Sequence, residues 1–522
     1  MNFSLTKTLL TLVTLSCTSI AAVKPARMFM DHMVIQRQTQ APVWGEADPG
    51  EQVSVSASWG DSAKTIADKD GKWLLKIQTP EAGGPHSLIF VGTNKIEIKD
   101  VLAGDVWLCT GQSNMGWPIS KSNNAEQEIA NAHYPHIRSF KVERNPSLKK
   151  VTNFGGEWKV CSPTTVHDFS ATAYFTGRKL HKELNVPIGL LTTCWGGTAV
   201  ESWTPWADQL DDPFARARKS IFDQKAKSYS PESAKANYEK QLELRKQNLD
   251  NSKKSKKRKP RKPVLATDPH LDQNYPGNLY NGMLHPLVPF AVKGAIWYQG
   301  EKNAKSIASA EHYRFQLARM IKSWRQAWKK EIPFYSVQLP NFKTPQVNPV
   351  EHKNIWPAIR ESFVHVTENL VNAYTVTTID LGEDKSIHPK NKQDVGRRLA
   401  SVILNKSYAK KTPTTPFMKS FKIEEDKILV HFNYTGSGLV AKGAKLKAFA
   451  IAGKDKKFIW ADAEIVNRNG VDCVIVSSPA IKKPVAVRYA WADNPTACNL
   501  FSKEGFPASP FRTDAWSLTT EK

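Results

Sequence analysis

The segment that is most informative about the fold of this chain is Val106-Trp107-Leu108-Cys109-Thr110-Gly111-Gln112-Ser113-Asn114-Met115. An apolar run ends at a glycine, and a hydroxyl side chain follows at the turn into the next segment. This arrangement is typical of an open α/β sheet, in which ligands bind beyond the carboxyl ends of the strands. Ser113 could serve there as a nucleophile beside its own backbone N–H, or it could cap a helix.

Three further segments place polar groups after apolar strands. Gly196 and Gly197 follow the strand predicted at 188–193, and their backbone could approach a ligand closely and donate N–H groups. Gln299, Glu301 and Asn303 follow the strand at 293–298, where amide donors could hold an oxyanion or a sugar hydroxyl. His388 lies in a loop after the strand at 374–381 and could accept the proton of Ser113. Each segment alone fits a tight turn or a surface loop, but together they predict one crevice.

The chain around these segments alternates strands with helices from residue 104 to 412. Helices are expected at 171–184, 312–328 and 392–404, and strands at 105–109, 188–193, 293–298, 334–339 and 374–381. Such alternation predicts a parallel sheet with helices on both faces.

Two β-rich regions flank this part, and one charged stretch interrupts it. Short strand signals separated by turn residues predict a β-sandwich at 23–103 and a second β domain at 413–522. Residues 211–268 are expected to form a surface insertion, with a charged helix at 234–249 and a basic run at 253–262. This run fits a solvated loop, although attraction to an acidic polysaccharide or an anionic surface is an alternative.

The first 22 residues have the features of a signal peptide: Lys7, a short apolar stretch and small residues at 19–22. We therefore expect a secreted or periplasmic protein without an integral membrane segment. The formal net charge is +24, but no groove-reading motif accompanies it, and export argues against nucleic acid as a partner. Five cysteines remain after residue 22; Cys473 and Cys498 could pair, and no Cys/His cluster suggests a metal.

Four long motifs resemble the conserved blocks of the SGNH hydrolases, specifically the sialate O-acetylesterase family of carbohydrate esterases. They are VWLCTGQSNMGWP (106–118), TCWGGTAVESW (193–203), LYNGMLHPLVPFAVKGAIWYQGEKNA (279–304) and IHPKNKQDVGRRLA (387–400). The resemblance covers most of residues 24–405. It implies a three-layer α/β/α, flavodoxin-like hydrolase domain carrying β-sandwich domains, with no metal or organic cofactor.

The resemblance also implies roles for individual residues. Ser113 would be the nucleophile and His388 the general base, and the oxyanion hole would combine the Ser113 N–H, an N–H of Gly196 or Gly197, and the Asn303 side chain. Substrate contacts would come from Gln112, Trp195, Gln299 and Glu301.

Two positions depart from the family pattern. Ser386 stands where the family usually has an aspartate that orients the histidine, so Asp384 or Glu383 could substitute, or a Ser-His dyad could remain. Gly116 stands where the family usually has a glutamate.

The sequence therefore predicts a secreted serine esterase that removes O-acetyl groups from a glycan, possibly an acidic one, through an acetyl-serine intermediate. An acetylxylan or other polysaccharide acetylesterase is the alternative substrate class. A carbohydrate-binding protein with impaired catalysis and a surface adhesin are alternatives of other classes.

Overall fold

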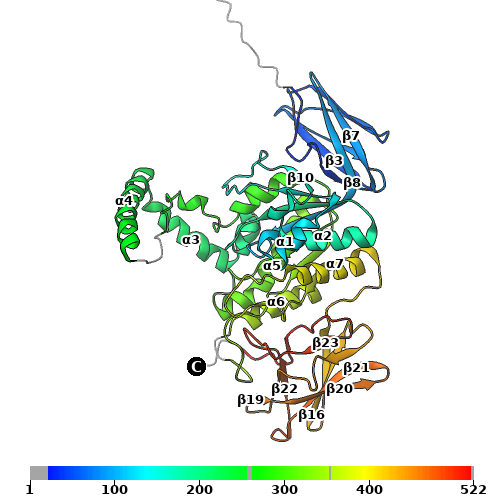
Figure 1. Ribbon diagram of the computed structural model, residues 1–522, viewed down its shortest axis with the longest axis vertical. Coiled ribbons are helices and arrows are strands. Elements are labelled where there is room, and N and C mark those ends of the chain that lie inside the picture. Colours follow the sequence, from blue (N-terminus) through cyan, green and yellow to red (C-terminus); the bar gives the residue numbers. More distant parts are fainter. Residues whose placement is uncertain (1–21, 256–260, 352–353, 519–522) are drawn as a thin grey trace, which may run out of the picture.

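The computed structural model describes residues 22–255, 261–351 and 354–518. Three regions follow one another along its long axis: N-terminal strands, a central α/β region and C-terminal strands (Figure 1). The segment expected to be a signal peptide lies outside the described residues except for Ala22, as do most side chains of the basic run at 253–262. Among the described residues, no helix is long and apolar enough to cross a membrane.

The central sheet has the order β10-β9-β11-β8-β12-β13-β14. Its strands are β8 (Lys95–Gly111), β9 (Tyr134–Lys141), β10 (Trp158–Cys161), β11 (Ile188–Cys194), β12 (Gly294–Tyr298), β13 (Phe334–Val337) and β14 (Ala373–Val376). All neighbouring pairs from β9 to β14 are parallel, and β10 is antiparallel to β9. The sequence β11-β8-β12-β13-β14 is the 2-1-3-4-5 order of flavodoxin-like folds.

Helices cover both faces of this sheet. They are α2 (Ala171–Leu184), α5 (Ile307–Trp328), α6 (Trp356–Asn369) and α7 (Lys392–Tyr408). Phe334 and Tyr335 are adjacent in β13 and therefore point to opposite faces. Phe334 packs on Trp324 of α5, whereas the Tyr335 hydroxyl bonds Ser407 of α7 at 2.7 Å. Since α5 packs with α6 and α7 with α2, the predicted three-layer α/β/α fold is confirmed.

Several element boundaries differ from the predictions. Helix α5 begins at Ile307, not at 312, because Ser306 and Ser309 form a capping box at its start. Helix α6 was not predicted, and β13 and β14 end earlier than expected, at Val337 and Val376.

The N-terminal strands share their hydrophobic core with the central region. They are β1 (Lys24–Pro25), β2 (Val34–Gln36), β3 (Gln40–Glu46), β4 (Gln52–Ala57), β5 (Ser62–Ile66), β6 (Lys72–Gln78) and β7 (Gly83–Val91). Strand β8 pairs with β7 in its first half and then continues into the parallel sheet, so the boundary expected between 103 and 104 falls inside one strand. One buried cluster contains both Val43 and Trp107.

The C-terminal strands have a hydrophobic core of their own. They are β15 (Phe417–Glu424), β16 (Lys427–Asn433), β17 (Leu439–Ala441), β18 (Phe449–Ala452), β19 (Phe458–Trp460), β20 (Asp462–Arg468), β21 (Val471–Ser477), β22 (Ala486–Tyr489), β23 (Leu500–Ser502) and β24 (Phe511–Arg512). Fully buried Arg360 of α6 joins this region to the centre, because its guanidinium donates to the carbonyls of Leu339, Ala492 and Asp493.

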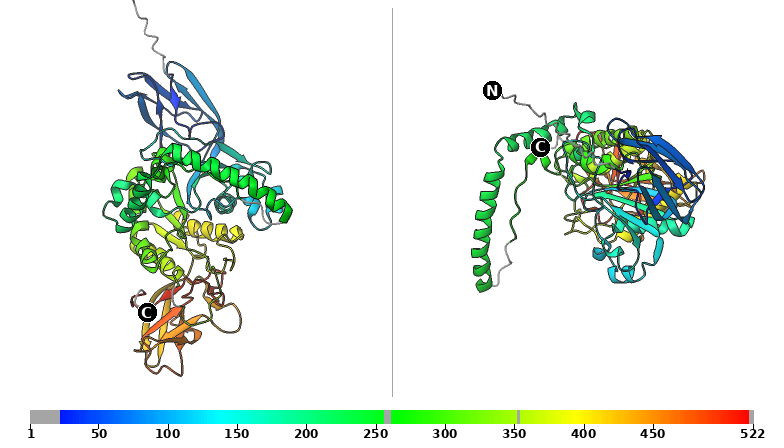
Figure 2. Two further views of the ribbon diagram at one scale, coloured as in Figure 1. Left: turned by 90° about the vertical axis from the view of Figure 1, so that its left-hand side faces the viewer. Right: turned by 90° about the horizontal axis from the view of Figure 1, so that it is seen from above.

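The insertion consists of two helices with different surroundings. Helix α4 (Pro231–Ser255) projects away from the body of the molecule (Figures 1 and 2). Helix α3 (Pro213–Lys227) packs against the body, and its Arg218 forms an ion pair at 3.1 Å with buried Glu201. The expectation of a surface insertion therefore describes α4 but not α3.

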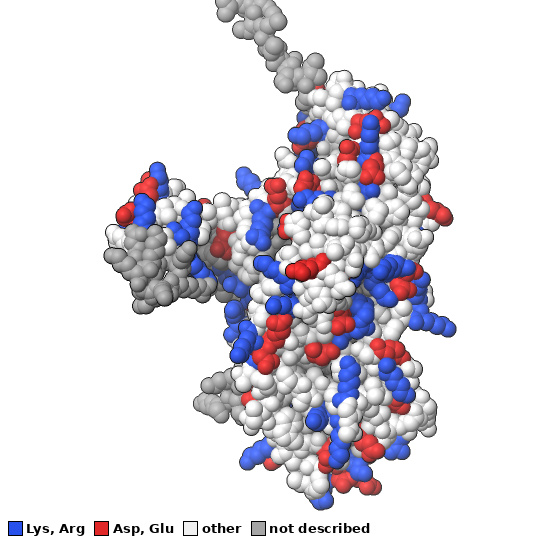
Figure 3. Space-filling view, in the orientation of Figure 1, with Lys and Arg blue, Asp and Glu red and all other residues white. Residues whose placement is uncertain are grey.

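The charged side chains and the cysteines of the described residues show neither a single-sign surface in the view of Figure 3 nor a disulfide. Lys and Arg side chains are interspersed with Asp and Glu over the face shown in Figure 3. All five cysteines in the described ranges are free thiols, so Cys473 and Cys498 form no disulfide. The Cys473 thiol contacts His431 Nδ1 at 3.1 Å.

Candidate active site

Three strands of the central sheet end at the same level. Gly111 of β8 is in register with Cys194 of β11 on one side and with Tyr298 of β12 on the other. The polar segments that follow these strands therefore emerge together at one edge of the sheet. Gly111 has φ 135° and approaches the Tyr298 carbonyl so closely that a Cβ atom would clash with it. Only glycine fits this turn.

Ser113 and His388 meet at this edge. The Nε2 atom of His388 lies 2.7 Å from Ser113 Oγ, a hydrogen-bond distance suited to proton transfer. His388 stacks on Trp117, with 5.1 Å between ring centroids and 16° between ring planes. The ring thereby faces the Ser113 hydroxyl, which comes from a different strand end.

The surroundings of His388 favour its neutral form. Burial lowers the pKa of this imidazole, and the cations Lys392 and Lys121 lower it further. A neutral imidazole can accept the Ser113 proton, so the site is prepared for base catalysis at neutral pH.

No carboxylate among the described residues contacts the His388 ring. Within the described part of the chain, His388 Nδ1 has no hydrogen-bond partner. Among the residues that the structure describes, Ser386 Oγ forms hydrogen bonds only with the backbone N and O of His388, both at 3.2 Å. Asp384 accepts from Asn494 at 2.8 Å, and Glu383 accepts from the Lys390 N–H at 2.8 Å. The carboxylates of Asp384 and Glu383 are therefore engaged with other partners, away from the His388 ring.

Backbone N–H groups are available for an oxyanion. Gly196 lies directly against the nucleophile, since a Cβ atom added to it would be 3.2 Å from Ser113 Cβ. The N–H groups of Ser113, Gly196 and Gly197 donate to no acceptor among the residues that the structure describes. They are the donors that a tetrahedral intermediate would need.

The Asn303 side chain, predicted as a third oxyanion donor, is directed elsewhere. Its Nδ2 donates to the Glu201 carboxylate at 2.9 Å, and its Oδ1 accepts from the Val200 N–H at 3.0 Å and from Gln299 Nε2 at 2.8 Å. A buried carboxylate is a strong acceptor, so it holds this amide in place. Asn303 therefore ties the β12 turn to the β11 turn.

Of the predicted substrate contacts, Gln299 is engaged within the protein, whereas Trp195 and Gln112 lie at the nucleophile turn with few partners. Gln299 is buried, and its amide bonds the Thr198 carbonyl, Asn303 and the Tyr313 hydroxyl, so it supports the loops. Trp195 is half-buried beside the nucleophile turn, with the Arg144 guanidinium 5.3 Å from its ring centroid. The buried Oε1 atom of Gln112 has no hydrogen-bond partner among the described residues.

A buried network beneath the nucleophile was not predicted. Asn114 Nδ2 donates to Glu301 at 2.6 Å and to the Ile387 carbonyl at 3.0 Å, and Lys392 Nζ donates to Asn114 Oδ1 at 2.7 Å. Asn114 thus joins the nucleophile turn to the loop that carries His388. The network residues lie inside the quoted motifs, but nothing in the sequence indicates that Lys392 is buried.

Burial shifts both ionisable groups of this network toward neutrality. It lowers the pKa of Lys392 to about 7, although Glu301 and Glu383 raise it. Burial raises the pKa of Glu301, which the Asn114 hydrogen bond and Lys392 lower. Each charge is therefore tolerated largely because the other is present.

A pocket of about 660 Å³ opens beside the nucleophile turn and includes Gly116, Lys141, Arg144 and Cys194 in its lining. A Cβ atom on Gly116 would be 3.0 Å from Cys194 Sγ, so a side chain at this position would require Cys194 to shift by a few tenths of an ångström. Burial raises the pKa of the Cys194 thiol to about 11, and Lys141 and Arg144 lower it because both cations lie near. The pocket lining therefore includes the exposed cations Lys141 and Arg144 next to the site, together with the carboxylates Glu143, Glu157 and Asp168.

Comparison with known proteins places the chain among carbohydrate esterases. A family model described as carbohydrate esterase, sialic acid-specific acetylesterase, matches residues 271–405. Sialate O-acetylesterase of Mus musculus is 27% identical over 523 residues, covering 92% of both chains, and that of Homo sapiens is 26% identical over 526 residues, covering 92% of this chain and 90% of that protein.

A solved structure extends the similarity to nearly the whole fold. The crystal structure of a carbohydrate acetylesterase from Xanthomonas citri superposes with a TM-score of 0.78 at 34% identity, covering 95% of this chain and all of the other. With this identity and coverage, the chain belongs to the sialic acid-specific acetylesterase family of carbohydrate esterases and is itself a carbohydrate esterase.

Proposed function

We propose that this esterase removes O-acetyl groups by serine acyl transfer, with Ser113 as the nucleophile. The observation that carries this proposal is the 2.7 Å contact between Ser113 Oγ and His388 Nε2, beside three backbone N–H groups that donate to no described residue. A nucleophile, a base and oxyanion donors are the parts that acyl transfer requires.

The reaction has two halves. Ser113 Oγ attacks the acetyl carbonyl while His388 Nε2 takes the hydroxyl proton, and the N–H groups of Ser113, Gly196 and Gly197 stabilise the oxyanion. The C–O bond to the sugar then breaks, and His388 returns the proton to the sugar hydroxyl. Water, deprotonated by His388, releases acetate from the acetyl-serine and restores the Ser113 hydroxyl.

For the substrate we propose an O-acetylated acidic sugar, as in a sialoside. Lys141 and Arg144 form no ion pair with any described residue, and both line the pocket beside the nucleophile turn. An acidic glycan would complement these charges, and sialate is the substrate class in the names of the mammalian relatives. The expected signal peptide supports a secreted or periplasmic location for such an enzyme.

Acetate release tests this proposal. Ser113→Ala is expected to lower hydrolysis of p-nitrophenyl acetate and of acetylated sugars at least about 10⁴-fold, with an unchanged circular dichroism spectrum. Arg144→Gln is expected to raise KM for O-acetyl sialosides but not for acetylxylan or p-nitrophenyl acetate. Wild-type turnover by Ser113→Ala would refute the mechanism, and preference for acetylxylan would refute the acidic substrate.

A further inference from the structure

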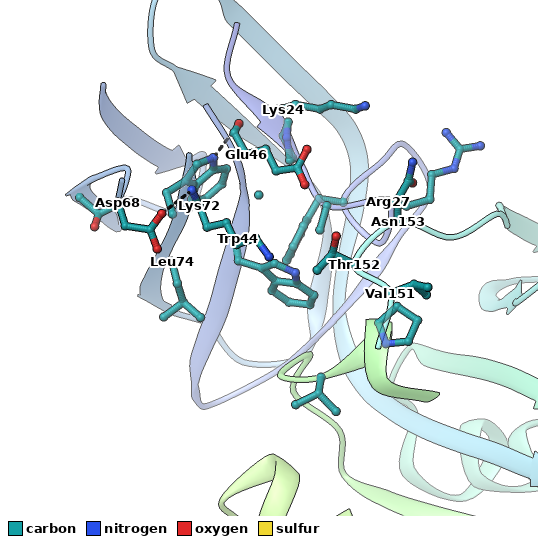
Figure 4. Close-up of a pocket in the computed structure, with 18 of the residues that line it drawn as sticks. Lys24, Arg27, Trp44, Glu46, Asp68, Lys72, Leu74, Val151, Thr152 and Asn153 are labelled. Carbon is teal, nitrogen blue, oxygen red and sulfur yellow. Dashed lines mark hydrogen bonds between the residues drawn. The ribbon is translucent and has the colours of Figure 1, made fainter. Parts of the chain in front are cut away.

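A second pocket lies at the seam between the N-terminal strands and the central region, with a volume of about 630 Å³. Strands β1, β3 and β6 form one wall, and the loop containing Thr152 and Asn153 forms the other (Figure 4). The proposed mechanism uses none of its residues. Concave sites that combine apolar walls with a few polar groups are typical of ligand pockets.

Trp44 forms the aromatic wall of this pocket. Its indole is half-buried and packs at 5.0 Å against the buried Phe29 ring, nearly perpendicular to it, and at 6.3 Å against buried Phe290. The ring is therefore fixed by its neighbours, while part of its surface faces the pocket (Figure 4). A fixed aromatic surface provides contact area at a low cost in conformational entropy.

Polar groups around Trp44 have little intramolecular bonding. The exposed side chains of Glu46 and Lys24 form no ion pair with any residue in the described ranges, and the Glu46 carboxylate also accepts no hydrogen bond there. Exposed Thr152 and Asn153 lie across the pocket from them (Figure 4). These carboxylate, hydroxyl and amide groups could all bond sugar hydroxyls.

The seam pocket and the pocket beside Ser113 have one lining residue in common. Arg27 lines both pockets, and its Nε atom is fixed by donating to the Gly156 carbonyl at 2.9 Å. A ligand in the seam pocket could therefore continue past Arg27 toward Gly116 and Cys194. Only an extended molecule, such as a glycan chain, could occupy both places.

We propose that the seam pocket is an accessory subsite that binds a pyranose unit of a glycan chain whose acetylated unit is at Ser113. The apolar face of the sugar packs on Trp44, and its hydroxyls bond Glu46 and Asn153. This inference rests on the proposed function for the identity of the chain that is bound. The subsite adds a second contact between enzyme and polymer, remote from the reacting ester, and so lengthens the time that the polymer stays bound.

Binding is tested in the Ser113→Ala background, so that the ligand is not consumed, by electrophoresis through gels containing soluble acetylxylan or O-acetylated sialoglycoprotein. Trp44→Ala and Glu46→Ala are each expected to weaken retardation about tenfold in at least one gel. Glu46→Ala removes a side chain without an intramolecular partner, so it keeps the test valid if Trp44→Ala fails to fold. Trp460→Ala, at a tryptophan 43% exposed on β19, is the matched control and should be retarded normally.

Kinetics distinguish this subsite from the catalytic site. With Ser113 intact, Trp44→Ala and Glu46→Ala should leave kcat/KM for p-nitrophenyl acetate unchanged and raise KM only for the polymer. Retardation equal to that of the Trp460→Ala control, or absence of polymer binding by the Ser113→Ala protein, would overturn the subsite. An active Ser113→Ala enzyme would instead refute the proposed function, whatever the gels show.

Discussion

Replacing Lys392 by methionine should remove a specific pH dependence of stability. Lys392 is fully buried and its pKa is about 7 in the folded protein, whereas that of an unfolded lysine is about 10.4. Between these values the unfolded chain binds one proton more than the folded chain, so stability rises with pH by up to about 1.4 kcal/mol per pH unit. Below pH 7 both states are protonated and this slope vanishes.

This slope predicts a measurable change in the free energy of unfolding between two pH values. From pH 7.5 to 9.0, Lys392 should add about 2 kcal/mol to the free energy of unfolding of the wild-type protein, and Lys392→Met should lack this gain. Urea denaturation followed by tryptophan fluorescence at the two pH values measures the difference between the proteins, in which titrating groups that do not interact with Lys392 cancel.

Two further variants make the test specific. Lys385→Met, at an exposed lysine of the same loop region, should keep the wild-type pH dependence. Glu301→Gln removes the anion that raises the pKa of Lys392, so its stability should begin to rise at a lower pH than in the wild type. Parallel pH profiles for wild type and Lys392→Met would show that Lys392 is not a buried, shifted group, and the network beneath Ser113 would then be misassigned.

Three other changes should have distinct effects. Lys121→Gln removes a cation that lowers the pKa of His388, so the acid limb of kcat/KM should move to higher pH; an unmoved limb would contradict this electrostatic role. Ser386→Asp should supply the missing carboxylate beside His388 and raise kcat at least about tenfold on p-nitrophenyl acetate, whereas a loss of activity would show that the dyad geometry excludes it. Arg360→Met leaves buried carbonyls unpaired and should cost about 4 kcal/mol, measured by thermal denaturation and by faster proteolysis of the C-terminal strands; unchanged melting would refute the anchoring role.

Local sequence patterns predicted most elements of the central region, but not strands β9 and β10 or helix α6. Helix α2 has the predicted bounds because Ser170 caps its first turn and Asn185 adopts a left-handed conformation at its end. Helix α6 escaped prediction because Ile355, the residue before it, provides no side-chain cap, although Pro357 in its first turn is itself a helix-start signal. Boundaries of this kind depend on packing against neighbouring strands more than on local propensity.

The chain alone determined which chemical groups are present and which follow a strand: Ser113, the Gly196-Gly197 pair and His388. Periodicity and turn residues are local properties, so the sequence displays them directly.

The tertiary structure determined which of these groups lie next to one another. Strand order placed β8 between β11 and β12, and a loop returning from the edge strand β14 brought His388 to Ser113. In the folded interior, Asn303 donates a hydrogen bond to Glu201, and the buried Lys392 donates one to Asn114. Hydrogen-bond partners depend on the distances between side chains and on their burial in the folded protein, and the sequence alone specifies neither.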